Sequence, residues 1–157
     1  MASAAYKIKE DLSNLKVVLM NYDAKLKNAK EDLRLDRKSY MQANGEQAAL
    51  IAYYDYIGDE LDIMVADMEL RYKVARGKAM KLITGSSPKE YTEKNMGMLL
   101  DTDPTTIKCL KAMFELKERR EKARTIVNSF VQRGYALTNI LKSREGEFHE
   151  EKMHVNE

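Results

Sequence analysis

The sequence predicts an all-α fold, and three observations support this. The 157-residue chain has only two prolines, seven glycines and no tryptophan, and the long stretches between them are rich in Lys, Glu, Leu, Ala and Met. Apolar residues in these stretches recur at alternating spacings of three and four, as in helices that pack along a heptad seam. The turn and capping signals fall between the seams. We therefore expect one helical bundle or coiled coil, with oligomeric assembly.

The first two seams predict a long helical hairpin over residues 1–83. A helix from about residue 4 into the late thirties would be roughly 50 Å long, and Asn44-Gly45 is the first turn signal after it. A second helix is expected over residues 46–83, antiparallel to the first. The seam residues are Ile8, Leu12, Leu15, Leu19, Tyr22, Leu26, Ala29 and Leu33 in the first helix, and Leu50, Tyr54, Ile57, Leu61, Met64 and Met68 in the second.

Residues 84–103 are expected to form a loop and a short helix. Thr84-Gly85-Ser86-Ser87-Pro88 ends the second helix, because glycine takes a left-handed C-terminal position readily and proline blocks continuation. An amphipathic piece follows over residues 89–100. Asp103-Pro104 then predicts a helix start, with an N-cap acceptor followed by proline at the first helical position.

The third region, residues 104–157, is predicted to be a long helix with an acidic tail. Its heptad stripe continues to about Arg144, which is longer than a small monomer needs, so we expect part of it to face another subunit. The alternative is that this helix completes a monomeric bundle. The residues assigned to an oligomer interface are Met113, Leu116, Val127, Phe130, Gly134, Leu137 and Leu141.

The net charge of +2 conceals strongly charged blocks. Residues 41–70 contain seven acidic side chains and no basic one, whereas residues 71–94 contain seven basic and two acidic side chains. On a helix, the cations of residues 71–81 form a broad ridge that suits the phosphates of a nucleic acid. The candidate DNA-binding residues are Arg71, Lys73, Arg76, Lys78, Lys81, Lys89 and Lys94.

Internal pairing is the alternative explanation of the basic block. Its cations could form salt bridges with the acidic block 46–69 of the same or a neighbouring chain. Tyr72 and Tyr91 lie in or near the block and could stack on unpaired bases, although a packing role is the ordinary explanation for Tyr72.

The sequence offers no support for an enzyme, a metal site or a cofactor. His149 and His154 are five residues apart in the acidic tail, which is not the i, i+4 spacing of zinc-binding histidines. Cys109 lies on the heptad stripe with no histidine nearby, as expected of a buried small hydrophobe. No phosphate-cradling glycine loop occurs, and no apolar run approaches the ~20 residues that span a membrane. The single cysteine and the lack of a signal sequence favour the cytoplasm.

Residues 64–148 resemble the UvsY recombination mediators of T-even-like bacteriophages. Short motifs carry the resemblance by their order and spacing: Lys73-Val-Ala, Gly85, Tyr91, Met96, Leu99-Leu100 and Gln132-Arg-Gly-Tyr-Ala-Leu137 before an Ile-Leu pair. One difference is that Gly77 and Ala79 fall where the family has a basic pair, with Arg76 and Lys78 just before them.

The resemblance implies a non-catalytic protein that binds single-stranded DNA. Members of the family contact a single-strand binding protein and a RecA-like recombinase, and help to load the recombinase onto covered strands in the bacterial host. They form ring-like homo-oligomers, largely through the C-terminal region. The competing prediction is a structural coiled-coil adaptor or phage assembly protein that does not bind nucleic acid.

Overall fold

A computed structural model of the chain describes residues 12–35, 38–86 and 92–154. These ranges contain a short 3-10 turn η1 (Leu12–Asn14) and the helices α2 (Leu15–Asp32), α3 (Tyr40–Ser86), α4 (Glu93–Asp101) and α5 (Pro104–His154). No strand occurs in them, so the all-α prediction is confirmed for this part of the chain. The first eleven residues, Lys89 and Tyr91 lie outside the described residues.

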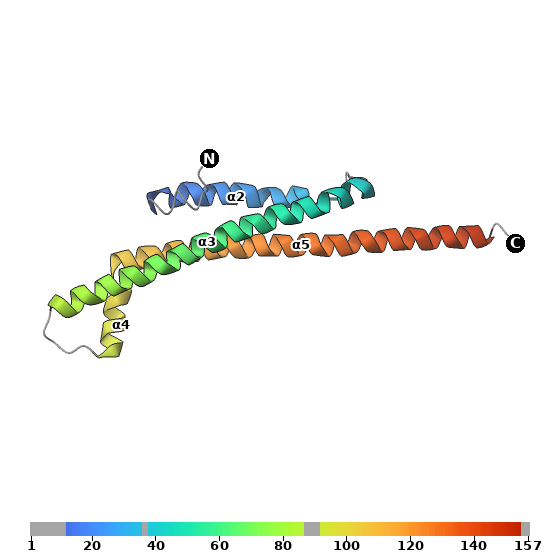
Figure 1. Ribbon diagram of the computed structural model, residues 1–157. Coiled ribbons are helices and arrows are strands. Elements are labelled where there is room, and N and C mark those ends of the chain that lie inside the picture. The colour runs from blue at the N-terminus through green and yellow to red at the C-terminus, as the bar shows by residue number, and fades with distance from the viewer. Residues whose placement is uncertain (1–11, 36–37, 87–91, 155–157) are drawn as a thin grey trace.

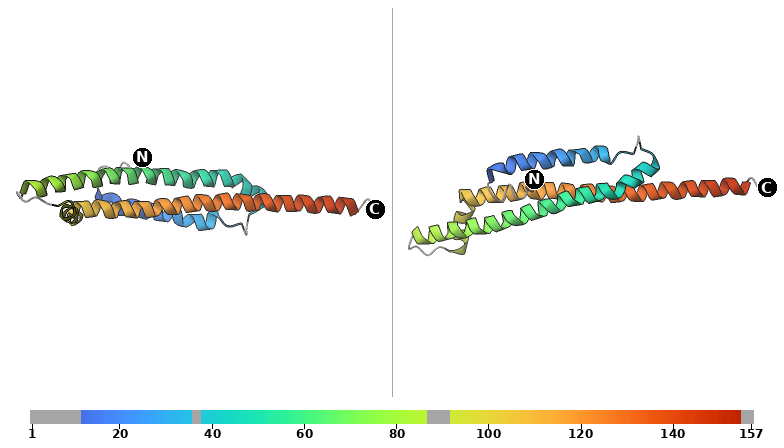
Figure 2. Two further views of the ribbon diagram at one scale, coloured as in Figure 1. Left: turned by 90° about the horizontal axis from the view of Figure 1, so that it is seen from below. Right: turned by 45° about the horizontal axis from the view of Figure 1, so that its top comes forward.

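Two long antiparallel helices, α3 and α5, form the frame of the molecule (Figure 1). The shorter α2 lies along them, and α4 runs across the end at which α3 finishes and α5 begins (Figure 2). The expected hairpin of the first two helices is therefore a minor contact, and the main partner of α3 is α5. The physical reason is length: α2 has 18 residues and can cover only part of the 47-residue α3.

The predicted turn at Asn44-Gly45 is wrong, because α3 begins at Tyr40 and continues through both residues. A capping box starts the helix earlier. The Ser39 hydroxyl accepts a hydrogen bond from the Gln42 backbone N–H at 3.3 Å, and the Gln42 side-chain oxygen accepts one from the Ser39 N–H at 3.2 Å. This cap overrides the local turn preference of Asn-Gly.

The predicted start of α5 is confirmed. The Asp103 carboxylate accepts a hydrogen bond from the Thr106 backbone N–H at 2.7 Å, and Pro104 is the first helical residue. This hydrogen bond lowers the pKa of Asp103, since it stabilises the ionised form. The helix continues to His154, ten residues beyond the predicted end near Arg144.

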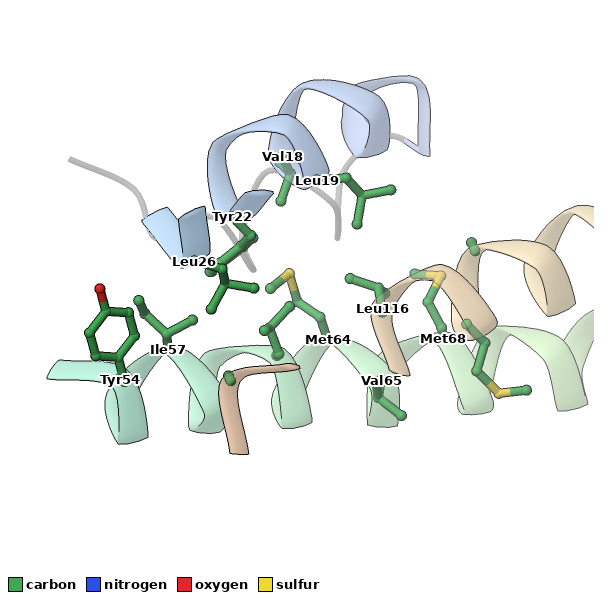
Figure 3. Close-up of a cluster of buried hydrophobic side chains, with 14 of the residues drawn as sticks. Val18, Leu19, Tyr22, Leu26, Tyr54, Ile57, Met64, Val65, Met68 and Leu116 are labelled. Atoms are coloured by element: carbon green, nitrogen blue, oxygen red, sulfur yellow. The ribbon is translucent and has the colours of Figure 1, made fainter. Parts of the chain in front are cut away.

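The hydrophobic core lies where α2, α3 and α5 meet (Figure 3). Tyr54 of α3 stacks on Phe130 of α5, with ring centroids 5.5 Å apart. Fully burying a side chain of this kind contributes about 1.5–3 kcal/mol. Other members of the cluster are Leu19, Tyr22 and Leu26 from α2, Ile57, Leu61, Met64 and Met68 from α3, and Met113, Leu116 and Ala123 from α5.

Candidate nucleic-acid interface

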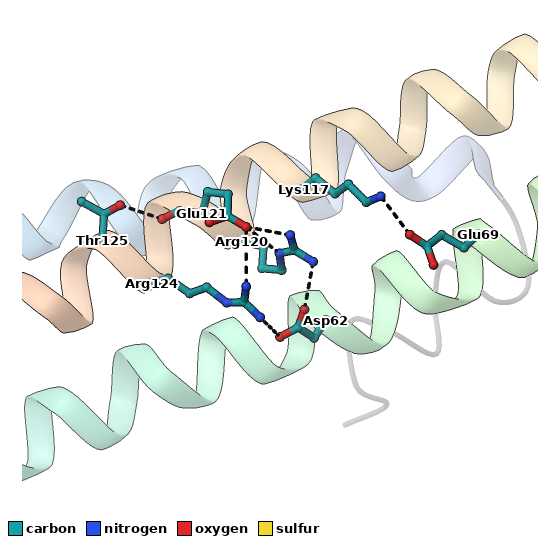
Figure 4. A network of polar contacts seen from close by, with 7 residues as sticks. All are labelled: Asp62, Glu69, Lys117, Arg120, Glu121, Arg124 and Thr125. Carbon is teal, nitrogen blue, oxygen red and sulfur yellow. Dashed lines mark hydrogen bonds and ion pairs between the residues drawn. The ribbon is translucent and has the colours of Figure 1, made fainter.

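Two carboxylates in the acidic part of α3 form ion pairs with cations of α5 (Figure 4). Asp62 lies 3.3 Å from Nη1 of Arg120 and 2.9 Å from Nη2 of Arg124, and Glu69 lies 2.8 Å from Nζ of Lys117. The Lys117 hydrogen bond and charge, helped by the more distant Lys73, lower the pKa of Glu69. Asp62 and Glu69 are thus paired with cations from α5.

Two further carboxylates of this block have partners outside α5. Glu60 accepts hydrogen bonds from the hydroxyls of Tyr22 and Tyr56, at 2.8 and 3.1 Å. Asp67 pairs with Arg71 one helical turn away, at 2.9 Å. Of the described DNA-binding candidates, Arg71 is therefore the one that pairs with the acidic block, as the internal-pairing alternative expects.

The other described cations of the candidate set do not pair with that block. Arg76 is half-buried, and its guanidinium donates to the Tyr72 hydroxyl at 3.2 Å. The remaining four are exposed, and none forms an ion pair with an acidic side chain in the described parts of the chain: Lys73, Lys78, Lys81 and Lys94. A cationic surface is thus left at this end of α3.

The antiparallel packing adds two lysines that the sequence analysis did not assign. Ala75 and Ala79 are buried on α3, and these small side chains let the first turns of α5 lie close to the basic segment of α3. Lys108 and Lys111 on those turns are exposed. Counting charges segment by segment along the sequence cannot identify these two lysines, because only the packing of α3 against α5 brings residues near 75 and 108 together.

A shallow groove of about 300 Å³ lies between α3 and α5 at this basic end. Its walls are mainly apolar, from Leu70, Val74 and Ala75, with Arg71 and Lys78 beside them. Cys109 is buried at the groove, in agreement with its prediction as a small hydrophobe. Cations beside an apolar surface suit a nucleotide, which offers both a phosphate and a base.

The C-terminal stripe has a partner within the chain, contrary to the expectation that it faces another subunit. Met113, Leu116, Phe130 and Leu137 are buried, because α3 and α2 cover this side of α5. Val127 packs against the same core. Burial therefore supports the alternative that α5 completes a bundle within one chain.

The remaining two residues of that assignment, Gly134 and Leu141, are less buried. Gly134 leaves room for the side chain of Gln47, since a Cβ there would lie 3.2 Å from the amide nitrogen. Leu141 is partly exposed, at 38%. In the same motif, Arg133 is buried and donates to the backbone carbonyls of Asp32 and Ala43, so its contacts are structural.

The described residues contain no group of three or more His, Cys, Asp and Glu side chains that could hold a metal ion. Among the same residues, no helix has both the length and the apolar character needed to cross a membrane. The side chains of His149 and His154 lie outside the described parts of the structure.

No protein-family model matches this chain, and neither does any curated protein or solved structure. The resemblance to the phage recombination mediators therefore depends on the order and spacing of the short motifs alone.

Proposed function

We propose that this protein binds single-stranded DNA through the basic end of the bundle. This strand-binding surface consists of Lys73, Lys78 and Lys81 of α3, Lys94 of α4, and Lys108 and Lys111 of α5. The observation that supports it is the distribution of ion pairs: α5 binds the carboxylates Asp62 and Glu69, and these exposed lysines remain unpaired among the described residues.

Counterion release supplies the free energy of this binding. Each lysine that neutralises a phosphate releases a condensed counterion, so affinity falls with salt by ~0.7 log units per log unit of salt for each contact on a single strand. Phosphates are common to every sequence, so the binding carries no base preference. Several copies acting on one strand would raise the apparent affinity of individually weak sites.

The proposed role is to help load a RecA-like recombinase onto strands covered by single-strand binding protein. The motif order shared with the UvsY mediators supports this role. This role needs no catalytic group. A recombinase filament-assembly assay on DNA coated with single-strand binding protein tests it. If the protein binds strands but leaves assembly unchanged, the loading role is wrong and the binding role stands.

Charge reversal tests strand binding directly. In low salt, Lys78→Glu with Lys81→Glu should weaken binding of a fluorescent oligonucleotide about tenfold or more, equivalent to ~1.4 kcal/mol. The salt dependence should also become shallower. Fluorescence anisotropy measures both. The matched control is Lys30→Glu with Lys142→Glu, which changes the net charge equally at exposed positions away from this end. Equal weakening by both pairs would contradict a localised strand-binding surface.

A structural adaptor is the second candidate function. It is favoured by large apolar side chains on α3 that remain exposed, among them Tyr56, Ile63 and Leu70. An adaptor of this kind would show no strand binding near physiological salt, whereas the proposed mediator would. The same anisotropy titration therefore separates the two candidates.

A further inference from the structure

The groove between α3 and α5 at the basic end has the form of a subsite for one small, flat group. Ala75 and Cys109 are buried at its floor. Leu70 and Val74 of α3 present apolar walls that remain 61% and 50% exposed, and Thr105 of α5 is the uncharged polar residue of the lining. The volume of about 300 Å³ is at the lower end of the range of ligand pockets. The groove is therefore sized for a single small group.

The charge of the lining favours an anionic ligand. The charged residues of this groove are Arg71 and Lys78, and none of its described lining residues is acidic. Two larger grooves, of about 720 and 500 Å³, lie between α2 and α5, and both are lined by Asp23 together with one or two glutamates. Carboxylates repel phosphates. The smaller groove is therefore the one that suits a nucleic acid.

Exposed lysines lie on both helices that form the groove. Lys78 lines it, and Lys81 is seven residues from Val74 and so lies on the same side of α3. On α5, Lys108 adjoins Cys109 in sequence and is exposed. Phosphates bound by lysines of the two helices would hold a nucleotide over the groove between them.

Arg71 differs from these lysines because its charge is already paired. Its Nε lies 2.9 Å from the Asp67 carboxylate, so a phosphate gains less from it. A guanidinium is planar and stacks on aromatic rings. Since Arg71 lines the groove, it offers a stacking surface to a base.

We infer that this groove holds one unpaired base of the strand that the surrounding lysines bind. The base packs against Leu70 and Val74 and stacks on Arg71, and its polar edge meets the Thr105 hydroxyl, which both donates and accepts hydrogen bonds. Every base has a stacking face, so the subsite tolerates any sequence. A base inside a duplex is already paired and stacked, so the groove selects single strands. This inference rests on the proposed strand binding.

An abasic strand tests the base contact. It has the same phosphates as an oligothymidylate of equal length but no bases. The wild-type protein should bind the oligothymidylate about fivefold or more tightly than the abasic strand, since a stacked base adds to the phosphate contacts. The salt dependence should be the same for both, because it reports the phosphates. Fluorescence anisotropy measures both quantities.

The outcomes separate this inference from the proposed function. Equal affinity for the oligothymidylate and the abasic strand would overturn the base subsite and leave strand binding by the lysines standing. Absence of binding to either strand would overturn both.

Substitution of the apolar walls locates the base. Leu70→Ser with Val74→Ser keeps every charge, and should remove most of the preference for the oligothymidylate while leaving abasic binding and the salt dependence unchanged. The matched control is Val17→Ser with Met20→Ser, at positions of α2 that are 69% and 63% exposed, which should bind both strands as the wild type does. Circular dichroism verifies that each variant is folded. A folded groove variant that keeps the full preference would overturn the assignment.

A duplex provides the last comparison, because it offers phosphates without an unpaired base. The groove variant Leu70→Ser with Val74→Ser should bind a duplex as the wild type does, whereas Lys78→Glu with Lys81→Glu should weaken duplex binding as well. Equal weakening of single-strand, abasic and duplex binding by the groove variant would show that the two apolar residues only support the lysines, and would overturn the inference.

Discussion

At the residue scale, Arg133 connects three helices. From α5 its guanidinium donates to the carbonyl of Asp32 at 2.7 Å, at the end of α2, and to that of Ala43 at 3.2 Å, in the first turn of α3. Burial lowers its pKa, yet a guanidinium remains charged at all ordinary pH values. A cation at the C-terminus of α2 also meets the negative end of the helix dipole. Arg133 therefore holds the end of α2 against the first turn of α3.

Replacement of this side chain should be costly. Arg133→Met keeps much of the volume but removes two charge-assisted hydrogen bonds, and we expect a loss of about 1–3 kcal/mol in the free energy of unfolding. Urea denaturation followed by circular dichroism measures the change. The neighbouring exposed Gln132→Met is the control. Equal stability of the two variants would show that the carbonyl contacts do not matter.

Two buried tyrosines predict a dependence of stability on alkaline pH. The Tyr22 hydroxyl donates to Glu60 at 2.8 Å, and the Tyr54 hydroxyl donates to Asp32 at 2.7 Å. Burial first, and then the carboxylate, raise the pKa of both tyrosines. The folded state thus favours the neutral phenol, whereas the unfolded chain ionises near pH ~10. The stability from these phenols is complete below that pH and is lost as the pH rises above it.

Phenylalanine substitution isolates this effect. Between pH ~8 and pH ~11, the melting temperature of the wild type should fall more than that of the variant with Tyr22→Phe and Tyr54→Phe, which lacks both ionising groups. The loss of lysine charge in the same range affects both proteins, so the difference between them reports the tyrosines. Parallel pH profiles would contradict the assignment.

At the element scale, the seam of α5 is a strict heptad. Cys109, Leu116, Ala123, Phe130 and Leu137 are each seven residues apart and all buried. A row at this spacing stays on one side of a helix that packs along a partner. The partner is α3 of the same chain, with α2 closing one side of the contact. The seam of α5 is thus the centre of the monomer fold.

Alanine substitution distinguishes this intrachain seam from an oligomer interface. Phe130→Ala should lower the free energy of unfolding by about 3–5 kcal/mol, because it removes a fully buried ring that stacks on Tyr54. The partly exposed Leu141→Ala should change it much less. Denaturant unfolding at several protein concentrations is the measurement. A Phe130→Ala effect that grows on dilution would place the ring between subunits instead.

At the scale of the whole molecule, the sequence predicted helices better than it predicted their pairing. Heptad spacing and the Asp103-Pro104 cap were sufficient for the class and for the start of α5. A seam does not specify which other seam it packs against, so the α3–α5 pair was not foreseen. The predicted turn at Asn44-Gly45 was wrong because the Ser39 cap and the burial of Ala43 outweigh the local preference of Asn-Gly for a turn.

The candidate interface was predictable only in part, for the same reason. Charge counted along the chain found the lysines of α3 and α4, but Lys108 and Lys111 join them through the packing of α5. The ion pairs of Asp62 with Arg120 and Arg124 could not be predicted either, because they also depend on the packing of α5 against α3. Whether a basic block forms ion pairs within the chain depends on which helix lies beside it. The spacing of apolar residues does not show which helices lie side by side.

The antiparallel frame also implies an order of events as the chain folds. Partners in the α3–α5 pair are 58 residues apart at Asp62 and Arg120, 83 at Gln47 and Phe130, and 90 at Ala43 and Arg133. Closing a longer loop costs more entropy, so the contacts nearest α4 form at the least expense and shorten the loop for the next. We therefore expect the α3–α5 pair to form first at its basic end, and the contacts of Arg133 with Asp32 and Ala43 to form last.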